Sequence, residues 1–491
     1  MRQKIILYLA GVFIVVFFIC YSAANPTPQI GYHAKFSIFY RNYKQYGVFK
    51  NRLFPHYNSQ MTNPPSIPVV AHSPFMPLVM YTAANFFGDK PATYSSVIIA
   101  INAIFFILLY MFVTRWWGQR IALWTLFFSA LSGYALAYAD LQTYEQICLV
   151  GGFSAIFLYF EWLKTKQARF FVLCALAYII GFVGDYSAFF AALIICLHWI
   201  FFIKDHNKGD FLKISFLPVV TVGYLVTIIF LMHSAGISLS VWLGRISTRL
   251  TGNQWNELVQ CFFKYNLILI GIIPLALSSI FFIFKIRHKK NGVKFPFESH
   301  IMYALFIAGL APVILLGNAY INHPFFVMSL VPFFAISAAL GVDILLNNTT
   351  AIRVRQLLVI VIVLGFLTQS FYVEKHEKRK SKLWYEYYKQ VISLSSKVKP
   401  YLKTNDRLFI FPDKDDLHKL TVFCELSIPS DAVLKVRNWK EIIASKNYSL
   451  ILTTDLETFN LIKGFPECRI LVSDGYIAFF RIIGGNEHAR D

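Results

Sequence analysis

The chain has 491 residues, of which 57% are apolar and 15% are charged, and its formal net charge is +20. Soluble proteins carry roughly 25% charged residues, so this composition excludes a soluble enzyme. A spanning helix needs roughly 20 residues, and the apolar residues suffice for roughly ten or eleven such helices. The positive charge does not point to nucleic acid as a partner, because no RNA- or DNA-reading motif interrupts the apolar runs.

The apolar runs are continuous, as in 5–21 and 97–113, whereas barrel strands alternate apolar and polar residues. We therefore predict a polytopic α-helical membrane protein of about eleven spans. The predicted spans lie near residues 5–21, 93–113, 121–138, 146–162, 170–184, 187–203, 214–232, 265–284, 301–316, 324–345 and 356–373. Residues 74–87 contain breakers and polar side chains that favour an interfacial helix (Pro74, Pro77, Thr82 and Asn85).

The Lys and Arg residues between the spans predict the orientation of the chain. With Arg2 and Lys4 inside, the basic clusters of the later loops fall on the inner side (Arg115, Arg120, Lys164, Lys166, Arg169, Lys204, Lys208, Lys213, Lys285, Arg287, Lys289, Lys290, Lys294, Arg353 and Arg355). Residues 1–373 then form a membrane domain whose outer loop, 26–92, carries interfacial helices. Residues 374–491 face outward despite five basic residues after the last span, since a long translocated domain weakens the rule there.

The tail after residue 373 is typical of a small α/β domain. Strands are predicted at 407–411, 448–453, 469–472 and 476–482, and helices at 384–398, 439–445 and 456–462. Outside the cytoplasm, Cys424 and Cys468 could form a disulfide; the alternative is two buried free thiols.

The predicted outer loop is basic. Residues 26–72 contain no Asp or Glu and five cations interleaved with aromatic rings (Lys35, Arg41, Lys44, Lys50 and Arg52). A site for an anionic lipid headgroup needs this chemistry. The alternative is an amphipathic surface helix whose cations contact the phosphates of membrane lipids.

Polar side chains recur at the outer ends of the predicted spans. Asp140, Glu145 and Asp185 are acids that are candidates for function. Because Glu145 and Asp185 each begin an apolar run, these two could instead cap the helices that follow them. Histidines accompany them on the same side, so a divalent cation is possible although the spacing does not demand one (His33, His56, His72 and His323). Arg245 and Arg249 could clamp a phosphate or face solvent.

Segments within residues 1–345 together match a family pattern. They are Tyr32-His33-Ala34, Tyr40-Arg41-Asn42-Tyr43, Tyr46-Gly47, 71–78, Phe86-Phe87-Gly88, Tyr144-Glu145, Gly184-Asp185-Tyr186 and His323 through Pro332. These motifs, in this order, resemble those of the GT-C membrane glycosyltransferases. The most similar branch contains the bacterial relatives of protein O-mannosyltransferases and lipid A aminoarabinose transferases. This resemblance implies a polyprenyl-phosphate-sugar donor that enters from the outer leaflet and an inverting transfer near the first loop.

The chain departs from that pattern in one place. The family usually presents an acid early in the first loop as the catalytic base, and here His33 occupies the corresponding position. The base is therefore His33, whose ordinary pKa suits the task, or Glu145 or Asp185 from neighbouring loops. An acceptor that needs no base, or a chain without activity, are further alternatives.

The resemblance and the chemistry together predict a glycosyltransferase of a bacterial inner membrane that acts on the periplasmic side. Cations must stabilise the departing phosphate, and the candidate substrate-binding residues are Arg41, Lys44, His72, Arg245, Arg249 and His323. The sugar is a hexosyl or pentosyl group, and the acceptor is a lipid, a glycan or a protein. A glycolipid flippase and a non-catalytic assembly factor are the competing interpretations, although transporters favour repeats and broken helices that the sequence lacks.

Overall fold

The computed structural model describes residues 2–27, 30–49, 53–54, 73–203, 207–234, 237–250, 252, 254–290, 297–398, 400, 408–411, 450–453, 456–474 and 477–482. These residues form long apolar helices and one small C-terminal sheet, which confirms the predicted fold class. The chain divides into two compact units. The first comprises Met1–Thr27, Val70–Met76 and Ala92–Arg379, and the second Pro28–Val69, Pro77–Pro91 and Lys380–Asp491.

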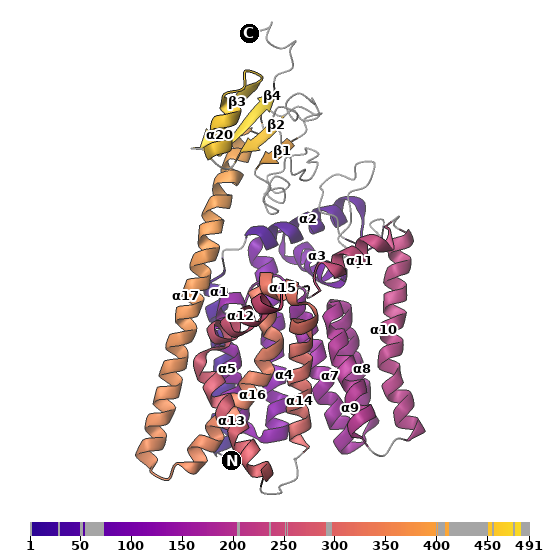
Figure 1. The fold of residues 1–491 in the computed structure, drawn as a ribbon, viewed down its shortest axis with the longest axis vertical. Helices are drawn as coiled ribbons and strands as arrows, with labels where there is room; N and C mark the ends of the chain where they lie inside the picture. Colours follow the sequence, from indigo (N-terminus) through magenta and orange to yellow (C-terminus); the bar gives the residue numbers. More distant parts are fainter. Residues whose placement is uncertain are drawn as a thin grey trace. The chain divides into compact units, whose positions relative to one another are not determined.

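Long apolar helices dominate the first unit, where they run side by side (Figure 1). Seven helical segments of the described chain are long and apolar enough to cross a membrane, and a bent pair of helices makes an eighth. They involve α1 (Arg2–Ala24), α4 (Pro91–Trp117), α7 (Glu145–Thr165), α10 (Lys208–Ser234), α14 (Glu298–Leu315), η3 (Pro324–Leu330) with α16 (Val331–Asn348), and α17 (Ile352–Val398). The protein is therefore a multi-pass membrane protein, and the number of eleven spans stays a prediction.

Shorter helices complete this unit. Those that are apolar but shorter than a usual span are α8 (Ala168–Gly184) and η1 (Tyr186–Ala188) with α9 (Phe189–Phe202). The others are α5 (Gln119–Ala130), α6 (Gly133–Tyr138), α11 (Leu239–Ser247), α12 (Trp255–Tyr265), η2 (Asn266–Ile270), α13 (Ile272–Lys290) and α15 (Gly317–Asn322).

Two predicted spans are not continuous helices. The run 121–138 is divided between α5 and α6, because the Ser132 hydroxyl accepts a hydrogen bond from the Ala135 N–H (3.0 Å) and starts a new helix there. The run 265–284 bends by 105° at Gly271, whose φ of +107° favours glycine. The Gln369 side chain of α17 bonds both sides of this break, accepting from Ile272 N (3.2 Å) and donating to Leu267 O (3.3 Å).

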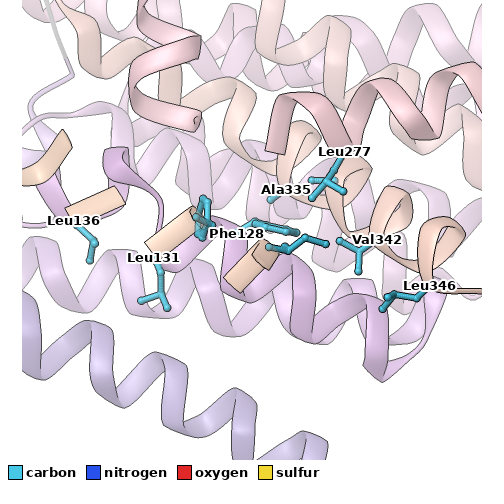
Figure 2. Packing of buried hydrophobic residues seen from close by; sticks show 10 residues of the cluster. Phe128, Leu131, Leu136, Leu277, Ala335, Val342 and Leu346 are labelled. Carbon is cyan, nitrogen blue, oxygen red and sulfur yellow. The ribbon is translucent and has the colours of Figure 1, made fainter. Parts of the chain in front are cut away.

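A hydrophobic core joins α5, α13, α16 and α17. Phe128 and Leu131 come from α5 and its end, Leu277 from α13, and Ala335, Val342 and Leu346 from α16, as Figure 2 shows. Phe366 of α17 packs edge-on against Phe128, with ring centroids 5.1 Å apart. This packing fixes α17 beside the bundle.

The second unit contains α2 (Ile30–Tyr46), α3 (Phe75–Phe87) from Pro77 onward, and a four-stranded sheet in the order β1-β2-β4-β3. The strands are β1 (Leu408–Phe411), β2 (Leu450–Thr453), β3 (Cys468–Asp474) and β4 (Ile477–Ile482). β1 and β2 are parallel, and the other neighbouring pairs are antiparallel. Helix α20 (Leu456–Lys463) covers the sheet with Ile462, which is fully buried with Ile451 and Phe480.

The predicted strands and the helix at 456–462 are thus confirmed, whereas the predicted helix at 439–445 lies outside the described residues. The predicted helices at 356–373 and 384–398 form one continuous helix, α17. The last Gly stands at residue 365 and no Pro lies between the two predicted helices, so no helix-breaking residue separates them. Among the described residues Cys468 has no disulfide partner, and burial raises the pKa of its thiol to about 11. Cys424 lies outside the described residues, so its pairing with Cys468 stays a prediction.

Candidate functional site

Close packing of α7 against α8 brings two acids to one end of the first unit. A Cβ at Gly151 would overlap the backbone of Gly181, so the two helices touch through their glycines. Glu145 is the first residue of α7, and Asp185 directly follows α8. Because the helices are antiparallel neighbours, these side chains lie at the same end. We call it the Glu145 end, formed by residues 133–145, 183–188 and 323–329.

Asp185 is held by its own turn. It is 6% exposed, and its Oδ1 accepts hydrogen bonds from the Ser187 N–H (2.9 Å) and the Ser187 hydroxyl (2.7 Å). The same hydroxyl lies 3.1 Å from Cys148 Sγ of α7. Asp185 therefore caps η1, as one interpretation of the sequence predicted, and its carboxylate also faces α7.

Glu145 is buried without such a cap. It is 5% exposed, and its Oε2 has no hydrogen-bond partner among the described residues. Its electrostatic neighbours are Asp185, of like charge, and Arg249, of opposite charge, which follows α11. Arg249 also interacts with the Tyr186 side chain. The structure thus brings together Glu145, Asp185 and Arg249 from distant parts of the sequence.

A cavity of about 70 Å³ has Glu145 in its wall, together with Ser187, which holds Asp185. Its walls come from α7, η1, α9, α14, η3 and α16, and they are mainly apolar (Leu149, Phe153, Ile156, Phe190, Leu305, Pro312, Phe326 and Met328). Its polar lining consists of Glu145, Cys148, Ser187 and Ser329. A cavity of this composition suits an apolar group with a polar end next to the acids.

Asp140 lies just before α7 and is 4% exposed. Its Oδ2 accepts a hydrogen bond from the Thr27 N–H (2.8 Å), which ties the end of α1 to the segment that leads into Glu145. Burial raises the pKa of the Asp140 carboxyl above its usual range, against the opposing effects of Thr27 and Lys378. The Tyr138 hydroxyl donates to Glu377 of α17 (3.1 Å), so α17 also contacts this region, and within α17 Lys378 pairs with Glu374 (2.6 Å).

Arg41 and Lys44 belong to the second unit and are both engaged there. Arg41 Nε lies 3.3 Å from Asp89 Oδ2, which also accepts from the Ser37 hydroxyl (2.7 Å). Lys44 donates to the Tyr40 hydroxyl (3.3 Å). Asp89 was missed from the sequence because it stands beyond the acid-free stretch 26–72.

The remaining predicted residues are placed as follows. The His323 ring, at the end of α15, lies 6.3 Å from the ring of Phe326, a cavity residue. His33 lies in α2 and Arg245 in α11, but neither side chain is among the described ones, and His72 lies outside the described residues. No group of three or more His, Cys, Asp or Glu side chains that could hold a metal gathers in the described part of the chain.

Sequence reasoning missed Cys148, Ser187 and Ser329. Only Ser187 could have been found from the sequence, because Asp185-x-Ser187 has the spacing of a helix cap. Cys148 and Ser329 sit in apolar runs, and only the fold brings them to the cavity.

Comparison with known proteins places the fold. No family model matches the sequence, and no curated protein matches it. ArnT from Cupriavidus metallidurans bound to undecaprenyl phosphate is a similar structure, with a TM-score of 0.64 and 11% identity over 99% of this chain and 98% of that chain. The apo oligosaccharyltransferase of Archaeoglobus fulgidus has a TM-score of 0.58 and 11% identity over 91% and 69%. The mycobacterial arabinofuranosyltransferase AftD has a TM-score of 0.50 and 11% identity over 99% and 40%. The chain therefore has the GT-C fold of polytopic membrane glycosyltransferases.

Proposed function

We propose that this chain transfers a sugar from a polyprenyl-phosphate donor to an acceptor at the Glu145 end. The observation that carries the proposal is the buried pair Glu145 and Asp185 with Arg249 as a charged neighbour of Glu145, and Glu145 lies in the wall of an apolar cavity. The GT-C fold supports it, since one similar structure, ArnT, was solved with undecaprenyl phosphate.

The chemistry assigns a role to each member of this cluster. A general base must take the proton from the acceptor, and Glu145 has an oxygen without a hydrogen-bond partner in the described structure. Asp185, oriented by Ser187, is the second candidate base. Arg249 stabilises the charge on the departing phosphate, because a guanidinium donates charge-assisted hydrogen bonds to phosphate oxygens.

Residues outside this cluster complete the proposal. His33 is the alternative base from α2, and Arg41, Lys44, His72, Arg245 and His323 are substrate-binding candidates. The donor sugar is a hexosyl or pentosyl group. The acceptor is a hydroxyl or amine on a lipid, a glycan or a protein. A chelator tests whether a divalent cation acts at the phosphate: if it does, the chelator should abolish transfer.

The location we propose is a bacterial inner membrane with the Glu145 end in the periplasm. The opposite end of α7 is rich in cations, including Lys164, Lys166 and Arg169. This end is the inner one by the positive-inside rule. Residues 374–491 then form a periplasmic domain that follows the membrane domain 1–373.

The test is transfer of radiolabelled sugar from a panel of polyprenyl-phosphate sugars in membranes that contain the full-length protein. We expect transfer by the wild type and by Glu257→Gln, a control at an exposed acid of α12, but not by Glu145→Gln or Arg249→Ala. Absence of transfer from every donor by folded, inserted protein would remove the proposal. Movement of the donor across the bilayer without its consumption would favour a flippase instead.

A further inference from the structure

A second pocket lies at the other end of the first unit. It has a volume of about 240 Å³. Its walls come from the end of α4 (Trp116 and Trp117), from α13 (Phe281 and Lys285), from the start of α14 (Glu298, Ser299 and Met302) and from α16 (Leu340). None of these residues belongs to the proposed transfer site.

This end, which we call the Lys164 end, is formed by residues 115–120, 161–169 and 297–302. Lys164 Nζ lies 4.4 Å from the ring centroid of Trp116, and Arg115 lies 2.6 Å from Glu161. Trp117 is the last residue of α4, and Glu298 is the first of α14. Tryptophans and cations where membrane helices end are typical of the headgroup level of a bilayer. The pocket therefore opens at the depth of lipid headgroups.

The polar groups of the pocket carry both signs of charge. Lys285 Nζ donates to the Ser299 hydroxyl (3.0 Å) and lies 5.9 Å from the centroid of the Phe281 ring. Glu298 attracts Lys285 electrostatically across the same pocket. A purely anionic ligand would be repelled by Glu298, and a purely cationic one by Lys285. A zwitterion satisfies both, with its phosphate toward Lys285 and Ser299 and its ammonium toward Glu298 and the tryptophan rings.

The rest of the lining points to a lipid rather than a soluble zwitterion. Met302 and Phe281 are buried apolar side chains, and Leu340 continues the apolar wall along α16. The volume lies below the roughly 300–1,000 Å³ of usual ligand sites, so it accommodates a headgroup while the acyl chains stay in the bilayer. A primary ammonium fits better than a quaternary one, because it can donate hydrogen bonds to the Glu298 carboxylate.

We propose that this pocket binds the headgroup of a zwitterionic phospholipid with a primary ammonium, of the phosphatidylethanolamine class. The proposal is independent of sugar transfer.

The test is native mass spectrometry of the full-length protein in detergent, titrated in parallel with phosphatidylethanolamine, phosphatidylcholine and phosphatidylglycerol. We expect the wild type to bind phosphatidylethanolamine about tenfold more tightly than the other two, the size of one charge-assisted hydrogen bond. Glu298→Gln should abolish the preference over phosphatidylcholine. Lys285→Gln should weaken binding of all three lipids.

Matched controls are Arg287→Gln, an exposed cation of α13 outside the pocket, and Asp343→Asn of α16, which pairs with Arg120 instead. Both should retain the wild-type preference. Thermal unfolding of each variant checks its folding, and Glu298→Gln alone decides the question if Lys285→Gln does not fold. Equal binding of all three lipids, tighter binding of phosphatidylglycerol, or equally tight binding of soluble glycerophosphoethanolamine would overturn the proposal.

Discussion

The two ends of α7 each bury a glutamate, but in opposite electrostatic surroundings. Glu161, 1% exposed, has the Arg115 guanidinium at 2.6 Å, so its charge is neutralised. Glu145, 5% exposed, has Asp185 as a like-charged neighbour and Arg249 as an oppositely charged one. Burying a carboxylate beside another one costs stability, whereas an ion pair offsets that cost. The unfavourable arrangement at Glu145 supports the proposal that this end carries the transfer site.

Replacing each glutamate in turn tests whether Glu145 serves transfer while Glu161 only forms an ion pair. Glu145→Gln should lower sugar transfer by about 100-fold or more, because a general base contributes that much and glutamine keeps the shape. Glu161→Gln should leave transfer nearly unchanged. Initial rates at saturating donor measure both, with equal amounts of folded protein. If Glu161→Gln lost as much activity as Glu145→Gln, the distinction between the two ends would fail.

Lys378 tests whether α17 supports the Glu145 end. Lys378→Met removes the cation that pairs with Glu374, which is 5% exposed and also accepts from the Tyr21 hydroxyl (2.5 Å). An unpaired buried carboxylate should lower the free energy of unfolding by about 3 kcal/mol. Denaturation followed by tryptophan fluorescence measures the loss.

Two further variants give that experiment its controls. Lys378→Arg should restore most of the stability, and Lys375→Met, at an exposed position of the same helix, should change little. The labelling rate of Cys148 by a maleimide then reports on the cavity without reference to activity. Unchanged labelling in Lys378→Met would show that α17 does not support the cavity.

The glycine contact between α7 and α8 tests how the acids are brought together. Gly151→Val places two methyl groups against the backbone of Gly181, so it should cost about 1–3 kcal/mol and also impair transfer. Gly223→Val in α10 is the control, since no atom lies within 4 Å of a Cβ there. Thermal unfolding of both proteins compares them. Equal stability would mean that α7 and α8 can separate without loss.

At the other end of α7, Glu161→Gln should destabilise the protein by only about 1 kcal/mol, because the Arg115 side chain is 51% exposed and can turn to water. The midpoint of urea denaturation measures the change. A loss as large as that of Lys378→Met would mean that Arg115 cannot be solvated when its partner is removed.

The sequence was sufficient for most of the apolar helices and for the strands near the C-terminus, since both follow from local, regular patterns of apolar side chains. It did not reveal the break at Ser132, because apolar residues continue on both sides of it. Nor did it show that Arg41 pairs with Asp89 or that α17 is a single helix.

The candidate site was only partly predictable for a similar reason. Glu145 and Asp185 were recognisable as charges at the ends of apolar runs, where charge is expensive, and Arg249 as a cation of an outer loop. Their meeting depends on the glycine contact of α7 with α8 and on the position of the segment after α11, which are properties of the folded chain.

The smallest expected effect concerns Asp140, the third buried acid of the Glu145 end. Its pKa is raised by burial, so the folded state holds the proton at pH values where the unfolded state, with a pKa near 3.9, has lost it. Stability therefore falls as the pH rises from about 4 through the folded pKa. Asp140→Asn mimics the protonated form, and its side-chain oxygen can still accept from the Thr27 N–H.

The variant should therefore be slightly more stable than the wild type at neutral pH, and this advantage should vanish near pH 4. Thermal unfolding at both pH values measures it, with Asp140→Ala as a control that loses the acceptor and is destabilised throughout. A less stable Asp140→Asn at neutral pH would mean that attraction to Lys378 outweighs burial. In that case Asp140 would resemble Glu161, and the contrast between the two ends of α7 would rest on Glu145 and Asp185 alone.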